Sequence, residues 1–366
     1  MTPSPPILHV ETGRHLYGGA LQVLYLLEGL RRRGVESLLV SPPGSAVAGA
    51  ARQRGLEVAE LPAGGDLDAL FVLRLQRLIR RRRPALIHLH SRRGADLWGG
   101  VAARVTGVPA ILTRRVDNLE PRPLVALKYR LYRRVIAISH GIESVLLSEG
   151  VARERLRCVP SAVDTERFRP GCDEAWFRTE FALEADRIPV GVIAQLIPRK
   201  GHRLLLEALP AIVEAHPRVL FLLFGRGPLE AELRDAIRRR GLETHCRLAG
   251  FREEIDRVLP CLRLVVHPAS MEGLGVSLLQ AAACGVPLVG CRAGGIPEIV
   301  REGESGRLVP VGDASALAEA VIDLLGDPEG AAGLGRAGRA LVEREFSIRA
   351  MVEGNLAVYR ELLPDL

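Results

Sequence analysis

The chain has 366 residues, of which 48% are hydrophobic and only 4% aromatic, and its formal net charge is +7. This length accommodates two domains of ordinary size, and the composition is typical of a soluble globular protein. No run of about 18 uncharged apolar residues is present, which argues against a transmembrane helix. The first 19 residues lack a basic start before an apolar core, so we expect a short tail before a first strand and not a signal peptide.

Charge is distributed unevenly along the chain. Residues 1–165 contain 25 Lys and Arg against 14 Asp and Glu, a net of +11, whereas the remaining residues carry a net of −4. Such asymmetry favours two domains with different tasks. The six cysteines form no C-x-x-C pair, so we expect free, buried thiols in a reducing cytosol and no zinc site.

Short apolar runs alternate with longer helical stretches in the first half of the chain. The alternation predicts helices near 21–33, 67–82 and 95–105, and strands near 7–10, 36–40, 85–89, 110–113 and 135–138. Strands that alternate with helices at this spacing indicate a parallel sheet covered by helices on both faces.

The second half repeats the scheme. Helices are expected near 204–215, 229–240 and 277–283, and strands near 190–194, 218–225, 246–248, 264–267, 288–290 and 307–309. The join falls in Val159–Pro170, where two prolines flank a polar turn and neither period continues. The sequence therefore predicts an α/β protein of two doubly wound domains, residues 1–165 and 166–347, with ligand sites near the carboxyl ends of the strands.

The segment from His267 to Val300 carries the strongest functional signal. An acidic residue, Glu272, precedes Gly273-Leu274-Gly275 and an apolar helix that starts near Val276. The first backbone N–H groups of a helix lack partners inside it, and glycines let a ligand approach them closely. The loop is thus suited to hold phosphate, with a carboxylate beside it for hydroxyl groups, as a sugar joined to a diphosphate requires.

These residues resemble the donor-site signature of the GT-B glycosyltransferases of family four, the "glycosyl transferases group 1" domain. That signature has two glutamates separated by seven residues, which correspond here to Glu272 and Gln280, and a Gly-Gly-Ile-Pro-Glu segment that matches 294–298 without change. The resemblance implies two Rossmann-like domains and a helix, 348–362, that packs back on the first. It also implies that position 280 holds the ribose, where the amide of Gln280 lacks the charge-assisted bond of a glutamate.

Two further loops fit the same resemblance. Gly18 and Gly19 follow the first strand and open a helix, where backbone N–H groups would face the donor diphosphate; a simple strand-to-helix turn is the alternative. In 194–201, Lys200 matches the family's lysine, Gln195 replaces its usual arginine, and Arg199 supplies a neighbouring cation. We expect Lys200 to neutralise the diphosphate; the alternative is a solvated surface pair.

In the first half, polar residues follow two strands. His88 and His90 lie on one face of a strand by alternation, and His90 is expected on the acceptor side by resemblance. A metal pair there lacks a spaced Asp, Glu or Cys partner, so no metal site is expected. Arg115 stands where many family members have a histidine, and we expect it to act on the diphosphate; a structural pair with Asp117 is the alternative.

Two charged patterns have simpler interpretations. Asp66-Leu67-Asp68 has the Asp-x-Asp spacing of a metal-binding motif from another transferase fold, but its place before a helix favours capping. The arginine runs at 31–33, 80–83 and in 128–134 fit solvated helix ends, or a basic face that docks on anionic lipid. Nothing has the motif of a nucleic-acid-binding module.

The resemblance implies a cytoplasmic, metal-independent and cofactor-free glycosyltransferase that retains anomeric configuration. Glu272, Lys200 and Arg115 are its expected catalytic residues. The expected partners are a nucleotide-sugar donor and a saccharide or lipid-linked acceptor in lipopolysaccharide or surface-polysaccharide synthesis, with the protein at the inner face of the cytoplasmic membrane. Two alternatives remain: an inactive nucleotide-sugar-binding protein, because Gln195, Arg115 and Gln280 replace common residues, and a sugar-nucleotide epimerase of the same fold.

Overall fold

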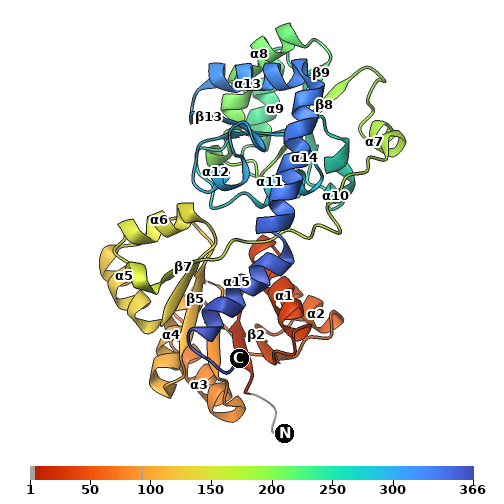
Figure 1. Ribbon diagram of the computed structural model, residues 1–366. Helices are drawn as coiled ribbons and strands as arrows, with labels where there is room; N and C mark the ends of the chain where they lie inside the picture. The colour runs from red at the N-terminus through yellow and green to blue at the C-terminus, as the bar shows by residue number, and fades with distance from the viewer. Residues whose placement is uncertain (1–4, 92–93) are drawn as a thin grey trace. The chain divides into compact units, whose positions relative to one another are not determined.

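The computed structural model describes residues 5–91 and 94–366. The chain divides into two compact units: unit 1 comprises Met1–Ser161 with Ile348–Leu366, and unit 2 comprises Ala162–Ser347. The sequence placed the boundary at 165/166, four residues after the division between Ser161 and Ala162. Each unit contains one parallel sheet flanked by helices (Figure 1), so the predicted α/β class with two doubly wound domains is confirmed.

Unit 1 is built on a seven-stranded parallel sheet in the order β3-β2-β1-β4-β5-β6-β7. Its central strands read ILHV and LIHL and are buried along their whole length, as expected for strands covered on both faces. The strands are β1 (Ile7–Val10), β2 (Ser37–Ser41), β3 (Val58–Glu60), β4 (Leu86–Leu89), β5 (Ala110–Arg114), β6 (Arg134–Ala137) and β7 (Leu156–Cys158). The two edge strands, β3 and β7, are three residues each and were not predicted, because so short a run shows no period.

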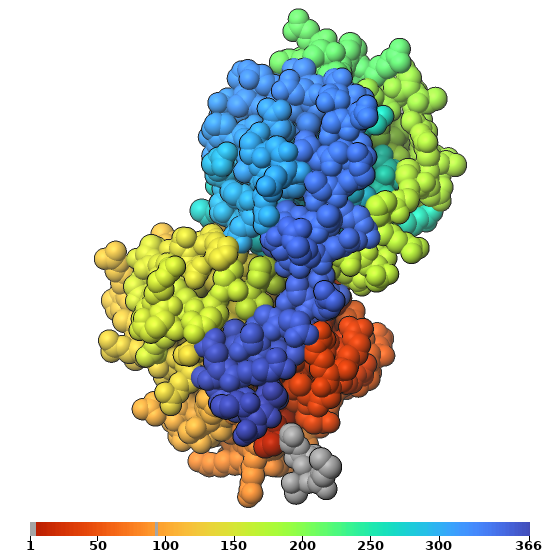
Figure 2. Space-filling view, viewed as in Figure 1, coloured from red at the N-terminus to blue at the C-terminus, as the bar shows by residue number. Residues whose placement is uncertain are grey.

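The helices of unit 1 cover this sheet, and the last helix of the chain belongs to the same unit. They are α1 (Gly18–Arg31), α2 (Ala46–Gln53), α3 (Leu70–Arg82), α4 (Ala95–Thr106), α5 (Arg122–Lys128), α6 (His140–Ser148) and α15 (Ile348–Arg360). Helix α15 packs on α1, and a Cβ placed on Gly29 would lie 2.3 Å from Cγ2 of Val352. Only glycine permits so close an approach of the two helices. Figure 2 shows the blue surface of α15 against the red surface of α1.

Unit 2 has a six-stranded parallel sheet in the order β10-β9-β8-β11-β12-β13. One face of the sheet packs against α8, α9 and α13 in a single core. The strands are β8 (Ile188–Ile193), β9 (Val219–Phe224), β10 (Cys246–Gly250), β11 (Leu264–His267), β12 (Leu288–Cys291) and β13 (Gly306–Val309). The helices are α7 (Glu174–Glu180), α8 (His202–Ala215), α9 (Glu230–Arg239), α10 (Ile255–Val258), α11 (Val276–Ala283), α12 (Ile296–Ile299), α13 (Ala314–Gly326) and α14 (Pro328–Glu345).

Both sheets change winding direction beside their first strand. Strand order reverses between β1 and β4 in unit 1 and between β8 and β11 in unit 2. In open α/β sheets, ligands bind outside the carboxyl ends of the strands at such a point, because the loops there part in opposite directions. A ligand site is therefore expected among the residues that follow β1, β4, β8 and β11.

The prediction of free thiols was wrong for one pair of cysteines. Cys172 and Cys261 form a disulfide in unit 2, with an S–S distance of 2.08 Å and a Cα–Cα distance of 4.8 Å. The two residues are 89 positions apart, so only the fold brings them together. The bond ties the segment before α7 to the short 3-10 helix Leu259–Cys261. The other four cysteines, at 158, 246, 284 and 291, form no disulfide.

The Asp-x-Asp triplet serves the start of α3, as its position before a helix suggested. The Asp68 carboxylate accepts a hydrogen bond from the Gly64 amide at 2.7 Å and pairs with Arg74. The Gly64 amide, together with Arg74 and the Phe71 amide, lowers the pKa of Asp68 against the opposing effect of burial. The formal N-cap is Ala69, one residue later than expected.

Among the helices in the described part of the chain, none combines the length and apolar content that crossing a bilayer would require.

Candidate functional site

In unit 2, the loop after β11 packs directly on the loop after β8. The Ser270 amide donates to the Arg199 carbonyl at 2.9 Å. Gly201 has a φ of +74°, and a Cβ there would lie 1.8 Å from the Pro268 carbonyl oxygen, so any other residue would push the two loops apart. The Lys200-Gly201 pair in the sequence therefore fixes how close the lysine lies to the loop of Glu272.

The side chains of Lys200, His267 and Glu272 form one buried polar cluster. Nε2 of His267 lies 2.8 Å from Oε2 of Glu272, and Lys200 Nζ pairs with the same oxygen. The side chains of Lys200 and Glu272 are 10% and 15% exposed. Burial alone would raise the pKa of Glu272, but the hydrogen bonds and charges of His267 and Lys200 lower it to about 2. Glu272 is therefore a fixed anion beside a fixed cation.

A glycine turn and a helix start complete the surroundings of Glu272. The Gly295 amide donates to the Glu272 carbonyl at 3.0 Å. Gly294 has a φ of +52°, and a Cβ there would lie 1.9 Å from the same oxygen. Helix α11 starts at Val276 after Gly275, which has a φ of +99° and supplies no side-chain cap. The first N–H groups of α11 are thus available to an anion.

The remaining donor-side candidates of unit 2 differ in exposure. Gln195 is exposed just beyond the end of β8, and Arg199 is half-buried beside Lys200. Gln280 is half-buried one helical turn after Val276, and its amide has no hydrogen-bond partner among the described residues. Leu274 is 2% exposed and serves packing. The structure thus brings Arg199, Lys200, Glu272 and the α11 start together, with Gln280 on the adjoining helix face.

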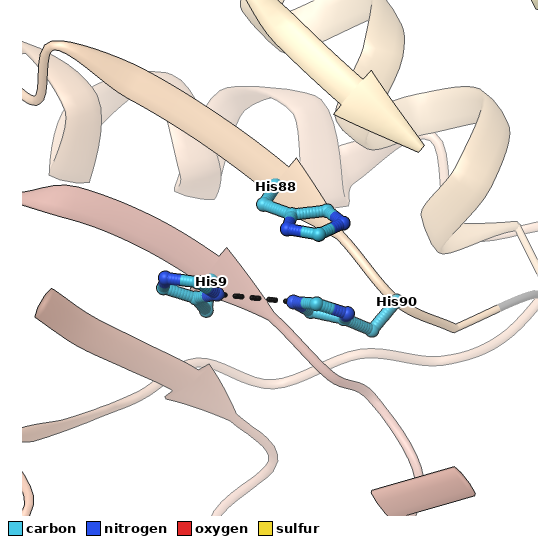
Figure 3. A group of neighbouring side chains, drawn as sticks. All are labelled: His9, His88 and His90. Atoms are coloured by element: carbon cyan, nitrogen blue, oxygen red, sulfur yellow. Dashed lines mark hydrogen bonds between the residues drawn. The ribbon is translucent and has the colours of Figure 1, made fainter. Parts of the chain in front are cut away.

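In unit 1, the two predicted histidines join a third. Parallel pairing of β1 and β4 sets His9 beside His88, and the rings of His88 and His90 are 3.9 Å apart. Nδ1 of His9 lies 3.0 Å from Nε2 of His90 (Figure 3). Both ring nitrogens of His88 are occupied, by the Tyr359 hydroxyl and the Thr113 hydroxyl, each at 2.6 Å.

The sequence suggested that His90 faces the acceptor, but its side chain is buried. His90 is 4% exposed and His9 and His88 are fully buried. Burial, reinforced by neighbouring histidines and Arg115, holds the pKa of His88 and His90 well below the ordinary value. The three imidazoles are therefore neutral. More accessible polar groups lie next to them: Thr12 and Ser91 share hydrogen bonds of 2.9 Å.

Arg115 lies against the glycine pair that opens α1. A Cβ on Gly19 would be 3.4 Å from Cδ of Arg115, and Nη1 of Arg115 is 3.4 Å from Oγ of Ser161. Burial lowers the pKa of Arg115 to about 10, while Glu11 and Tyr359 act in the opposite direction. The adjacent Arg114 points elsewhere and is 2.7 Å from Glu120.

The residues that sequence reasoning missed are His9, Tyr359 and His267. His9 had a usable signal, because parallel neighbours in a doubly wound sheet place the last residues of β1 and β4 side by side. His267 ends a predicted strand five residues before Glu272, so its proximity could also have been inferred. Tyr359 had none, since its contact with His88 spans 271 positions.

Two family models match successive parts of the chain. The model described as Glycosyltransferase Family 4 matches residues 17–167, and Glycosyl transferases group 1 matches residues 176–341. The 2-deoxystreptamine glucosyltransferase of Streptomyces kanamyceticus is 30% identical over 308 residues, which cover 78% of this chain and 80% of that protein. A GDP-mannose-dependent alpha-(1-6)-phosphatidylinositol monomannoside mannosyltransferase of Mycolicibacterium smegmatis is 37% identical over 206 residues, and there the match spans only about half of each protein, 50%.

Solved structures show the same fold. The Anabaena protein HepE in complex with UDP and glucose superimposes with a TM-score of 0.82 at 23% identity, covering 98% of this chain and 99% of that one. A glycosyltransferase from Rickettsia africae gives a TM-score of 0.88 at 18% identity, covering 99% and 100%. With the two family models and the Streptomyces relative, these similarities show that the chain belongs to the GT-B glycosyltransferases of family 4.

Proposed function

We propose that this protein transfers a sugar from a nucleotide-sugar donor to a hydroxyl group of an acceptor, with retention of anomeric configuration. The observation that carries the proposal is the buried cluster of Lys200, His267 and Glu272 beside the start of α11. It sets a cation, free helix N–H groups and an ionised carboxylate side by side. A donor's diphosphate needs the first two, and its sugar hydroxyls need the third.

Each residue of this cluster has a separate task in the proposal. Lys200, with Arg199 and the first N–H groups of α11, neutralises the diphosphate as it leaves, which lowers the barrier without a metal ion or cofactor. Glu272 accepts hydrogen bonds from the sugar hydroxyls and fixes the ring for attack. His267 holds Glu272 in place. Gln280 contacts the ribose.

The acceptor proposed here is a ring polyol, either a saccharide or a cyclitol, free or carried on a lipid. The names of relatives support this class: they include enzymes for 2-deoxystreptamine, for D-inositol 3-phosphate and for a phosphatidylinositol mannoside. A lipopolysaccharide or surface-polysaccharide precursor, expected from the sequence, belongs to the same chemical class and stays a proposal.

A panel of nucleotide sugars tests the function. Purified protein is incubated with each donor and a mixture of polyol acceptors, and nucleoside diphosphate and glycoside are both measured. Transfer gives the two products in equal amounts. Binding without product would support the inactive binding protein, and a changed sugar still attached to its nucleotide would support an epimerase; either result would overturn the proposal.

Lys200→Ala sharpens this test. We expect kcat/KM to fall by roughly 100-fold, as after loss of one preorganised charge at a leaving group. The matched control is Arg203→Ala, since Arg203 lies three residues further on, in α8, and pairs on the surface with Glu232. Equal activity in both variants would remove Lys200 from the diphosphate site.

We also propose that unit 1 binds anionic membranes. The support is the net charge of +11 over residues 1–165, and α3, where exposed Leu70 and Leu73 stand on the helix that ends in the run Arg80–Arg83. Each cation near such a surface contributes up to about 1 kcal/mol. Vesicle flotation at low salt should show binding to anionic and not to neutral lipid.

Replacing all four residues of Arg80–Arg83 by Gln should weaken this binding. The matched control replaces Arg238, Arg239 and Arg240 at the end of α9 in unit 2. Equal flotation on neutral and anionic vesicles, or equal loss in both variants, would defeat the membrane proposal.

A further inference from the structure

Three histidine rings meet at the point where the sheet of unit 1 changes direction. His9 comes from β1, His88 from β4, and His90 from the residue just after β4. One ligand atom from each lies within 4.8 Å of the others. The rings of His9 and His90 are stacked, with 7° between their planes, and Nδ1 of His9 faces Nε2 of His90 (Figure 3).

The hydrogen bonds of this cluster are incomplete. A neutral imidazole has one N–H donor and one bare nitrogen acceptor. The contact between His9 and His90 uses one nitrogen of each ring, whichever tautomers are present. The other nitrogens, Nε2 of His9 and Nδ1 of His90, are buried and have no partner. One of these is then an N–H and the other a bare nitrogen, and both are buried without the hydrogen bond that each could make.

We propose that the side chains of His9, His88 and His90 form a binding site for a divalent transition-metal ion of the zinc, nickel or copper class. Three neutral imidazoles are the ligand set these ions prefer over magnesium or calcium. A tetrahedral ion with metal–nitrogen distances of about 2.0–2.1 Å holds its ligand nitrogens somewhat over 3 Å apart, close to the 3.0 Å between His9 and His90.

Metal binding fixes the tautomers of His9 and His90. With Nδ1 of His9 and Nε2 of His90 both bare and bound to the ion, their other nitrogens both become N–H donors. The third ligand is a nitrogen of His88, which must first release one of its two hydroxyl partners, Tyr359 or Thr113. The hydroxyl that stays bonded to the other ring nitrogen holds the ring in place, as such hydrogen bonds do in metal sites generally. The hydroxyl that His88 releases is a candidate for the fourth position.

Charged side chains near the three histidines affect how well this site binds a cation. Arg115 is close enough to influence His88 and His90 and would oppose a cation. Glu11 is in electrostatic contact with Arg115, so the arginine does not add an unbalanced charge. Burial and lowered pKa values keep the three rings unprotonated, which is the form that binds a metal. The three histidines belong to unit 1, whereas Lys200 and Glu272 belong to unit 2.

Cobalt(II) in place of zinc tests the site directly in the full-length protein. The protein is dialysed against a chelator and titrated with Co²⁺, and the visible ligand-field absorption of the bound ion is followed. We expect saturation at one equivalent, displacement by Zn²⁺, and a higher melting temperature with Zn²⁺ present. No saturable absorption and no melting shift at one equivalent would overturn the proposal.

Single substitutions locate the bound ion. His9→Gln and His90→Asn should each weaken Co²⁺ binding by at least about 100-fold, more than the loss of an outer-shell partner usually causes. The control is His15→Gln, an exposed histidine of the same unit. Circular dichroism establishes that each variant is folded. Absorption that persists in both cluster variants, or vanishes with His15, would place the metal elsewhere and reject the site.

Discussion

At the carboxyl ends of its central strands, unit 1 has three neutral imidazoles, and unit 2 has an ionised lysine, an ionised glutamate and a histidine. Both clusters are buried, and each follows from the same winding reversal in a parallel sheet. They differ in partners. Glu272 receives two donors, which stabilise its charge against burial, whereas His9 and His90 have only each other, so burial suppresses theirs.

This contrast shows that burial by itself does not decide ionisation. Desolvation acts on both clusters, raising the pKa of Glu272 and lowering that of His9. In unit 2 a lysine and a histidine contact the same carboxylate oxygen and reverse the effect, to a pKa of about 2. In unit 1 no carboxylate touches the rings of His9 and His90 among the described residues, and the pKa of His9 falls to about 3.

The largest expected effect comes from removing the carboxylate of unit 2. Glu272→Ala should lower kcat/KM by about 1000-fold, the range seen when a preorganised group is lost from a transition state. Steady-state kinetics with the best donor measures it, and Glu207→Ala on the exposed side of α8 is the control. If Glu272→Ala instead abolished cooperative melting, Glu272 would be required for folding. The difference in charge between the two clusters would then say nothing about catalysis.

Reduction of the disulfide should lower the stability of unit 2 and leave the stability of unit 1 unchanged. The Cys172–Cys261 bond closes a loop of 89 residues in unit 2, which corresponds to about 4 kcal/mol in a chain-entropy model. Calorimetry with and without a thiol reductant should show an earlier transition only for unit 2. The double variant Cys172→Ala/Cys261→Ala should melt early and not respond to reductant. A shift of both units alike would contradict the assignment.

Acid should weaken unit 2 through Glu272. Its pKa is about 2 in the folded protein against an ordinary value of 4.5, so the ion pair stabilises the fold above pH 4.5 and the contribution disappears as pH falls towards 2. The whole contribution is at most about 3 kcal/mol. Urea unfolding of wild type and Glu272→Gln should therefore converge between pH 5 and about pH 2. A constant difference across that range would mean that Glu272 is not ionised in the fold.

The smallest expected effect concerns Gln280. If its amide holds the ribose, Gln280→Glu should leave nucleoside diphosphate affinity unchanged or improve it by at most about 1–2 kcal/mol, because a charge-assisted bond replaces a neutral one. Calorimetric titration beside melting curves measures both quantities, with Gln53→Glu, at an exposed position at the end of α2, as the control. A less stable variant with unaltered intrinsic affinity would instead place position 280 in packing.

Much of the fold could be predicted from the sequence because local patterns carry it. The apolar runs of β1, β4, β9 and β11 and the helical period of α1 and α8 gave boundaries within about three residues. The short edge strands β3 and β7 could not be predicted, since three residues show no period and only pairing with a neighbour makes them strands.

The candidate site likewise has features that the local sequence predicts and features that only the fold decides. The sequence by itself determined that Lys200, Gly201, Glu272 and the pair Gly294-Gly295 occur at strand ends, because each motif lies within a few residues of its strand. Only the tertiary structure decided that Lys200 and His267 meet on one oxygen of Glu272, which gives the carboxylate its charge.

Three further contacts depend on folding alone: Cys172 with Cys261, His9 with His90, and His88 with Tyr359. The partners in each are 81 to 271 positions apart. Over such separations a side chain's partner is set by sheet order and helix packing, and no local pattern records it.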